Sequence, residues 1–180
     1  MRTLLAALAL LPLPVVAQQE CPAGLDPTTP AEHFRFHPDG TVTHLATGLV
    51  WQRCPLGTTW NDQGTPDDYL DDTCDGTPTT HTWQAALNSA VGSGLRLPNI
   101  KELGSIVELA CVTPALNTRV FPWNPDWPWN RENGRRGWRV WSATPSHAVN
   151  GVVYIRTMDV DGGASGADTS DQAFYVLLVR

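Results

Sequence analysis

Polar and apolar residues alternate along the stretch 34–52, which is the pattern of strands that bury one face. Two turn signals interrupt this pattern, Pro38-Asp39-Gly40 and Ala46-Thr47-Gly48. Further runs of β-branched and apolar residues predict three strands late in the chain, at 139–144, 152–158 and 174–179, with a Gly- and Asp-rich turn at 159–171. The chain is therefore expected to be rich in β-structure.

Two short helices are predicted between these groups of strands. Thr82 can cap a first helix that runs to Ala90. A second helix is expected after Asn99, where Glu102 stands in the position that completes a capping box. Its apolar residues have the spacing of one buried helical face: Leu103, Ile106, Val107 and Ala110. Clustered helices, instead of helices that alternate with strands, predict an α+β domain with an antiparallel sheet.

Three stretches show no regular period. Residues 18–33 are rich in Pro, Thr and Ala and are predicted to form an N-terminal tether. Residues 55–78 are predicted to form a long polar loop with many aspartates. Residues 122–138 combine tryptophans with arginines and are predicted to form a second long loop.

The first 17 residues have the parts of a signal peptide. Arg2 gives a positive start, and the apolar run that follows ends in small residues before a predicted cut after Ala17. The run from Leu4 to Val16 is too short to span a bilayer as a helix, and no later stretch has the length of a membrane span. We therefore predict an exported protein that is periplasmic, secreted or held at the cell surface.

The four cysteines support this prediction. In an exported chain an even number of cysteines indicates disulfides, and four cysteines allow three pairings. We favour Cys54–Cys74, which would stabilise the fold by about 3 kcal/mol through loop closure, and Cys21–Cys111, which would tie the N-terminal tail to the domain. The alternative is that the thiols bind a metal, but the sequence contains no Cys-x-x-Cys pair, which argues against it.

The charge balance is acidic. The chain has 12 basic and 18 acidic residues, and removal of the signal peptide changes the net charge from −6 to about −7 because it removes Arg2. Nucleic-acid binders usually carry a basic footprint. We therefore expect no nucleic-acid partner.

Four segments resemble one protein family. They are Asp39–Cys54, Thr82–Leu87, the Arg96-Leu97-Pro98 stretch that continues to Glu108, and Trp141–Pro145 with the closing residues 178–180. Together they resemble the Lcl C-terminal domain family, which is named from a collagen-like bacterial adhesin, over residues 34–180. The resemblance implies a single extracytoplasmic domain with a C-type-lectin-like α+β fold. For the adhesin, the same family resemblance implies that the domain binds sulfated glycosaminoglycans and has a role in attachment.

The aromatic and basic stretch is the first candidate for a binding site. Tryptophan rings can stack on sugars, and arginine forks can bind carboxylate or sulfate. The candidate ligand-binding residues are Trp123, Trp127, Trp129, Arg131, Arg135, Arg136 and Arg139. The alternative is that these tryptophans cover the core and the arginines pair with the acidic loop.

The aspartates of 159–171 are weaker candidates. Asp159 and Asp161 could ligate Ca²⁺ through oxygen, but the acidic residue that an EF-hand needs at its twelfth position is absent. Aspartates also form solvated turns, which is the interpretation we adopt. We therefore expect no metal and no cofactor.

These features predict a non-enzymatic binding and adhesion module, with a glycan or a matrix polymer as its partner. The second hypothesis is an interaction domain of an envelope or pilus-type assembly. A hydrolytic enzyme is the third, although the sequence has no Gly-x-Ser-x-Gly elbow and no catalytic residue is assigned.

The disulfide prediction can be tested directly. Protein from a periplasmic extract is alkylated without reduction and its mass is measured. We expect no labelled cysteine, because both pairs would already be oxidised. Two or more labelled cysteines would contradict the scheme, whereas a Cys21–Cys54 bridge would contradict only the pairing.

Overall fold

A computed structural model describes residues 19–66, 68–124, 127 and 137–180. The predicted signal peptide, residues 1–17, lies outside these ranges. The described chain forms three small antiparallel sheets, two short α-helices and a 3₁₀ turn at Ala31–His33. The α+β class is confirmed. No helix in the described residues has the length and apolar character of a membrane span.

The first sheet contains the predicted N-terminal strands. They are β1 (Phe34–Phe36), β2 (Thr41–His44) and β3 (Val50–Gln52), in the order β1-β2-β3. Both predicted turns are present between them. At the first turn Gly40 has a φ of +74°, and the ring of Trp60 lies 2.7 Å from the place where a Cβ would stand. Glycine is therefore required there both by conformation and by packing.

The predicted polar loop at 55–78 is in part a hairpin, so this prediction was wrong. It contains β4 (Thr58–Asn61) paired with β5 (Thr73–Gly76). Most side chains of both strands are polar and only Cys74 is buried. A hairpin with two polar faces gives no alternation of polar and apolar residues, which explains why the pattern did not reveal it.

The two helices begin where their capping residues predict. In α1 (Trp83–Ser89) the Thr82 hydroxyl accepts from the Ala85 N–H. In α2 (Ile100–Gly104) Asn99 and Glu102 form the complete capping box. However, α2 ends at Gly104, earlier than predicted, and Ser105 is its C-cap. Beyond this end the remaining apolar residues of the predicted face are still buried. Ile106 and Ala110 lie in turns, and Val107 forms an isolated bridge to Leu116.

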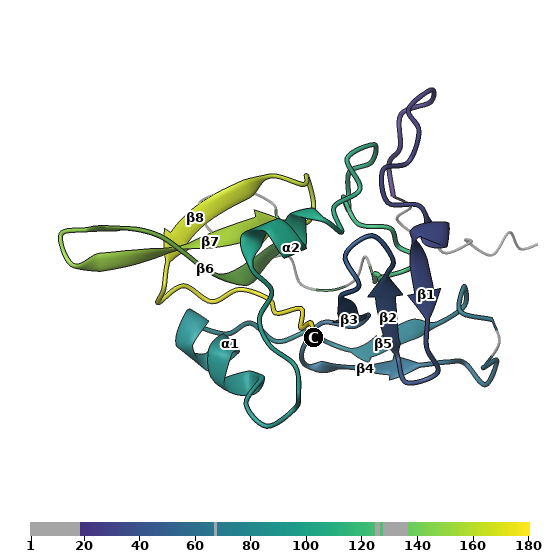
Figure 1. Cartoon of the computed structure of the whole chain (residues 1–180), viewed down its shortest axis with the longest axis horizontal. Coiled ribbons are helices and arrows are strands. Elements are labelled where there is room, and N and C mark those ends of the chain that lie inside the picture. Colours follow the sequence, from purple (N-terminus) through teal and green to yellow (C-terminus); the bar gives the residue numbers. More distant parts are fainter. Residues whose placement is uncertain (1–18, 67, 125–126, 128–136) are drawn as a thin grey trace, which may run out of the picture.

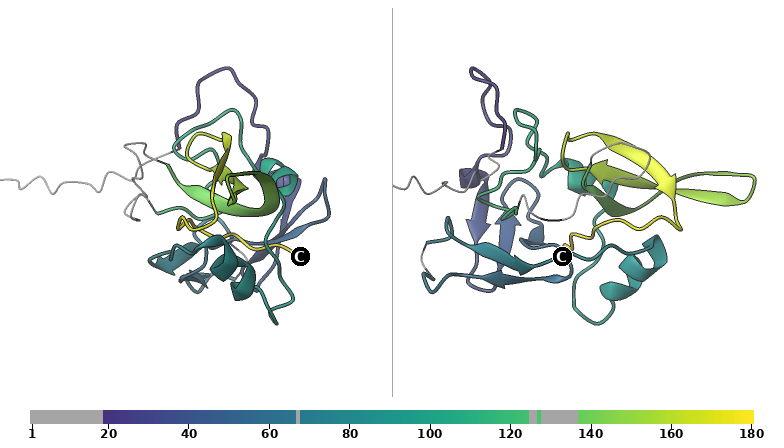
Figure 2. Two further views of the ribbon diagram at one scale, coloured as in Figure 1. Left: turned by 90° about the vertical axis from the view of Figure 1, so that its left-hand side faces the viewer. Right: turned by 180° about the vertical axis from the view of Figure 1, so that it is seen from behind.

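The third sheet has the order β6-β7-β8. The strands β6 (Arg139–Val149) and β7 (Val152–Asp159) are longer than predicted and form a hairpin that projects from the body like an arm (Figures 1 and 2). The third strand, β8 (Ser165–Thr169), lies inside the predicted turn at 159–171. Its sequence is polar and half-exposed, so it too lacked a pattern of apolar residues.

The segment 174–179 lies between the sheets and ends near the middle of the molecule (Figure 1). It was predicted as a strand, and it forms isolated bridges to Trp51, His81, Arg96 and Val140 instead of one continuous ladder. Its side chains alternate between two hydrophobic clusters. Tyr175, Leu177 and Val179 enter the larger cluster, and Phe174, Val176 and Leu178 enter the smaller one. This segment therefore joins the two clusters.

Both predicted disulfides are confirmed. Cys21 is bonded to Cys111 and Cys54 to Cys74, and the described residues contain no free cysteine. The first bond joins positions 90 residues apart in the sequence. The second bond joins Cys54, which precedes β4, to Cys74 within β5.

Arg53, next to this disulfide, is a buried cation whose side chain is 0% exposed. It forms an ion pair with Asp72, whose side chain is 1% exposed. Its Nε donates to the carbonyl of Val120 at 2.8 Å, and its Nη2 donates to the carbonyls of Tyr69 and Arg119, both at 3.1 Å. One guanidinium therefore connects the end of β3 with two separate loops.

We predict that Arg53→Ala lowers the free energy of unfolding by about 3–5 kcal/mol, because Asp72 is left as an unpaired buried charge. The measurement is urea denaturation at neutral pH. The matched control is Arg180→Ala, because Arg180 forms an exposed contact with Asp39 that is 4.0 Å long. This change should lower the free energy of unfolding by about 0.5 kcal/mol or less. The double variant Arg53→Met/Asp72→Leu should regain part of the loss, because no charge remains buried. An Arg53→Ala effect as small as that of the control would contradict the assigned role.

Candidate functional site

A cleft lies between the N-terminal segment and the loop 107–119. We call the N-terminal segment 19–33 the strap and the hollow beside it the Cys21 cleft. The cleft has a volume of about 460 Å³. Its lining residues are Gln19, Cys21, Pro27, Pro30, Ala31, Glu32, Glu108, Cys111, Asn117, Thr118 and Arg119.

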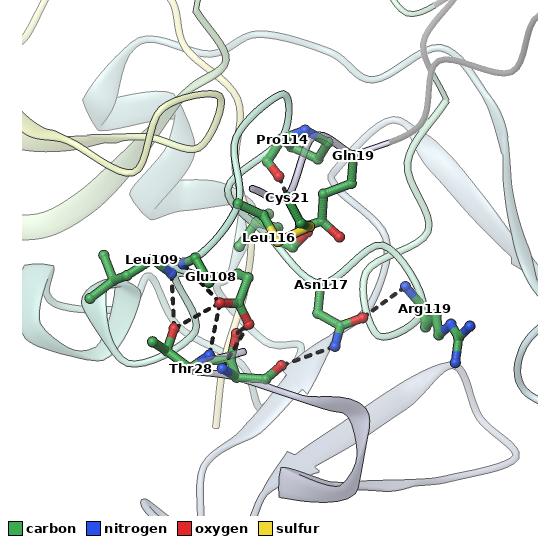
Figure 3. Close-up of a disulfide and its surroundings, with 12 residues drawn as sticks. Gln19, Cys21, Thr28, Glu108, Leu109, Pro114, Leu116, Asn117 and Arg119 are labelled. Atoms are coloured by element: carbon green, nitrogen blue, oxygen red, sulfur yellow. Dashed lines mark hydrogen bonds between the residues drawn. A yellow bond between two sulfur atoms is a disulfide. The ribbon is translucent and has the colours of Figure 1, made fainter. Parts of the chain in front are cut away.

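The strap is held at its start by covalent and polar contacts. Cys21 is bonded to Cys111, and Glu20 and Val112 exchange backbone hydrogen bonds of 2.8 Å. The side-chain amide of Gln19 donates to the carbonyls of Pro114 and Leu116 at 3.0 and 2.6 Å (Figure 3). The stretch that was predicted to be a tether is therefore fastened to the domain at its start.

Glu108 holds the middle of the strap (Figure 3). Its side chain is buried, and its carboxylate accepts backbone N–H bonds from Thr28 and Thr29, both at 2.8 Å, and from Ala110 at 3.0 Å. The hydroxyls of Thr28 and Thr29 add two further bonds. Burial raises the pKa of Glu108, but these hydrogen bonds lower it by more, so that its pKa lies below the ordinary value of 4.5.

Asn117 adds a further contact to the strap at Thr29. Its side-chain amide donates to the carbonyl of Thr29 at 2.9 Å, and its side-chain oxygen accepts from the N–H of Arg119 at 3.0 Å. The Arg119 side chain points away from Asn117 (Figure 3) and is exposed. Within the described residues neither Arg119 nor Glu32, which is also exposed, forms an ion pair. Both charges are therefore available to a ligand.

The tryptophans of the predicted binding loop have a different environment. Trp127 is only 3% exposed, and its Nε1 donates to the carbonyl of Gly76 at 2.9 Å. Its ring packs against Trp123 and Trp138, with ring centroids 5.7 and 5.4 Å apart. Trp123 is half-buried. In this structure Trp127 therefore belongs to the core and has no exposed ring face on which a sugar could stack.

The basic part of the predicted site is divided. Trp129, Arg131, Arg135 and Arg136 lie outside the described residues. Arg139 pairs with Asp168, and the same carboxylate accepts from the Thr157 hydroxyl at 2.6 Å. Arg139 is thus engaged within the sheet β6-β7-β8. The site that was predicted in this loop stays a prediction.

The weak calcium candidates do not converge on one point. An Asp159 oxygen accepts from the backbone N–H of Asp161 at 3.1 Å, which is an Asx turn. In the described part of the chain no group of three or more His, Cys, Asp or Glu side chains is placed to hold a metal ion. The expectation that no cofactor is needed remains a prediction.

Comparison with known proteins identifies the family. The model of the Lcl C-terminal domain matches residues 40–180. The chain belongs to this family. No curated protein and no solved structure was found to match it.

The motifs that resemble the Lcl C-terminal domain hold the fold together. Arg96 forms a bidentate ion pair with Glu102 at 2.7 and 2.8 Å. The indole N–H of Trp83 donates to the carbonyl of Ser142 at 3.0 Å, and that of Trp141 donates to the carbonyl of His81 at 2.7 Å. These roles are structural. The motif residues therefore identify the family without marking the cleft.

Sequence reasoning missed the free charges of the cleft. Glu32 lies in the stretch predicted as a tether, and Arg119 follows the end of the predicted second helix. One signal could have found them. The favoured Cys21–Cys111 pairing places the strap beside the loop that contains Arg119, and a cleft can form where two such segments meet.

We predict that acid loosens the strap. The pKa of Glu108 is lowered in the folded protein, so its stabilising effect is complete above the unfolded-state value near 4.5 and is lost as pH falls through the lower native value. The free energy of unfolding should therefore fall more steeply below about pH 4.5 for wild type than for Glu108→Gln. Urea denaturation of both proteins at several pH values measures the difference. Parallel pH curves would contradict the role of this carboxylate.

Proposed function

We propose that this chain is an extracytoplasmic, non-enzymatic binding and adhesion module with a C-type-lectin-like fold, and that its partner is a glycan or a matrix polymer. Two disulfides fit an oxidising compartment outside the cytosol. The family is named from a collagen-like adhesin, and the family match covers residues 40–180. Both observations support the proposal.

The observation that carries the proposal is the Cys21 cleft. Its volume of about 460 Å³ lies within the range of about 300–1,000 Å³ that is usual for ligand sites. Its walls are fixed by a disulfide and by the hydrogen bonds of Gln19, Glu108 and Asn117. A site that is held in shape before the ligand arrives loses little entropy on binding.

The chemistry of the cleft supports binding without catalysis. Both cysteines of its described lining are paired, and that lining contains no histidine. Glu108 is the buried carboxylate, and its oxygens are occupied by the strap. Glu32 and Arg119 remain to bind a ligand by hydrogen bonds and charge.

A second function has its own support. The arm formed by β6 and β7 exposes Val149, Val152 and Val153, which are 48%, 45% and 44% exposed (Figure 1). Apolar groups gathered at the end of a projecting hairpin are typical of contact surfaces for proteins. An envelope protein would be the partner in this case.

A glycan array with protein from a periplasmic extract tests the first function. We expect binding of at least one glycan, and weak or no retention on heparin at physiological salt. The net charge of −6 opposes a polyanion, and screening to about 8 Å weakens the attraction of any local arginines.

The control is the triple variant Val149→Ser/Val152→Ser/Val153→Ser, which should bind the same glycans as wild type. An empty array, together with loss of envelope attachment in this variant, would favour the second function. Tight retention on heparin would show that local arginines outweigh the net charge.

A further inference from the structure

Arg53 brings together two surface segments that are far apart in the sequence. A single nitrogen, Nη2, donates to the carbonyl of Tyr69 and to the carbonyl of Arg119, both at 3.1 Å. Tyr69 follows the β4 strand, and Arg119 lines the Cys21 cleft. Because both carbonyls bind one buried nitrogen, the backbone of Tyr69 lies close to the backbone of Arg119, although Tyr69 is not among the residues that line the cleft.

Tyr69 is an aromatic residue with a fixed position. Its ring stacks on Phe36, with ring centroids 5.1 Å apart and an interplanar angle of 11°. The ring of Phe36 lies in turn 4.9 Å from the guanidinium carbon of Arg53. Tyr69 is half-buried, so that part of its side chain is accessible. A partly exposed aromatic ring held in place by stacking is suited to contact a sugar.

The charges around this ring select against anions. Asp68 and Asp71 are exposed on either side of Tyr69. The cleft itself contributes Glu32 and Glu108 against the single cation Arg119. A sulfated chain would therefore meet net negative charge along this surface, whereas an uncharged sugar would meet only hydrogen-bonding groups.

We infer that Tyr69 and Arg119 form a subsite for one ring of an uncharged oligosaccharide, whose further rings enter the Cys21 cleft. The inference rests on the proposed glycan-binding function and names its ligand class. The apolar face of the sugar contacts Tyr69. The Arg119 guanidinium donates to sugar hydroxyls, and the Glu32 carboxylate accepts from others.

The test uses isothermal titration with cellotetraose, maltotetraose and tetra-N-acetylchitotetraose as neutral probes and a heparin-derived tetrasaccharide as the charged probe. We expect at least one neutral probe to bind. Its affinity should fall at least tenfold in Tyr69→Leu and in Arg119→Gln. The matched controls are Tyr154→Leu and Arg156→Gln on the β6–β7 arm, and they should change affinity less than twofold. Tyr154 is half-buried and stacked on His147, and Arg156 is exposed.

Each other outcome overturns a defined part of the inference. A neutral probe that binds all four variants equally would remove the subsite and leave the proposed function intact. Binding of the charged probe alone would overturn the ligand class. If none of the probes binds and the glycan array is empty as well, the proposed function fails together with the inference. If Tyr69→Leu does not fold, Arg119→Gln decides, because the Arg119 side chain is exposed and forms no ion pair within the described residues.

Discussion

The burial of one short segment on both sides is the constraint on which the fold depends. Phe174 to Val179 are all buried, and alternate side chains enter opposite clusters. The larger cluster includes Trp51, Trp138 and α2, and the smaller one includes Trp141 and α1. A strand that is buried on both faces is apolar throughout, which explains the continuous hydrophobic run here. The sheet β6-β7-β8 and the sheet β1-β2-β3 are thereby joined through this segment, although no continuous sheet connects them.

Polar contacts extend this framework to the surface that we propose to bind ligand. The disulfide Cys21–Cys111 and the carboxylate of Glu108 hold the strap, and Arg53 holds the loops of Tyr69 and Arg119. Each of these groups is buried or covalently fixed, whereas Glu32 and Arg119 are exposed. The structure thus separates residues that shape the cleft from residues that are free to contact a ligand.

Local signals in the sequence predicted local structure well. Thr82 and Asn99 start the two helices, and the turns at Gly40 and Gly48 separate the first strands, because caps and turns depend on a few adjacent residues. The polar strands β4 and β8 could not be predicted in this way, because neither presents an apolar face. The burial of Trp127 and the position of Arg119 depend on contacts distant in the sequence. The sequence offered the burial of Trp127 only as an alternative, and the Cys21–Cys111 pairing gave the one hint of where Arg119 lies.

The place of the segment 174–179 also sets the order in which the molecule can fold. During synthesis the earlier strands and both helices emerge first, but each hydrophobic cluster still lacks three of its side chains. Contacts between distant parts of a chain form late, because the loop between them must first be closed. Neither cluster can therefore be completed before this segment has been made.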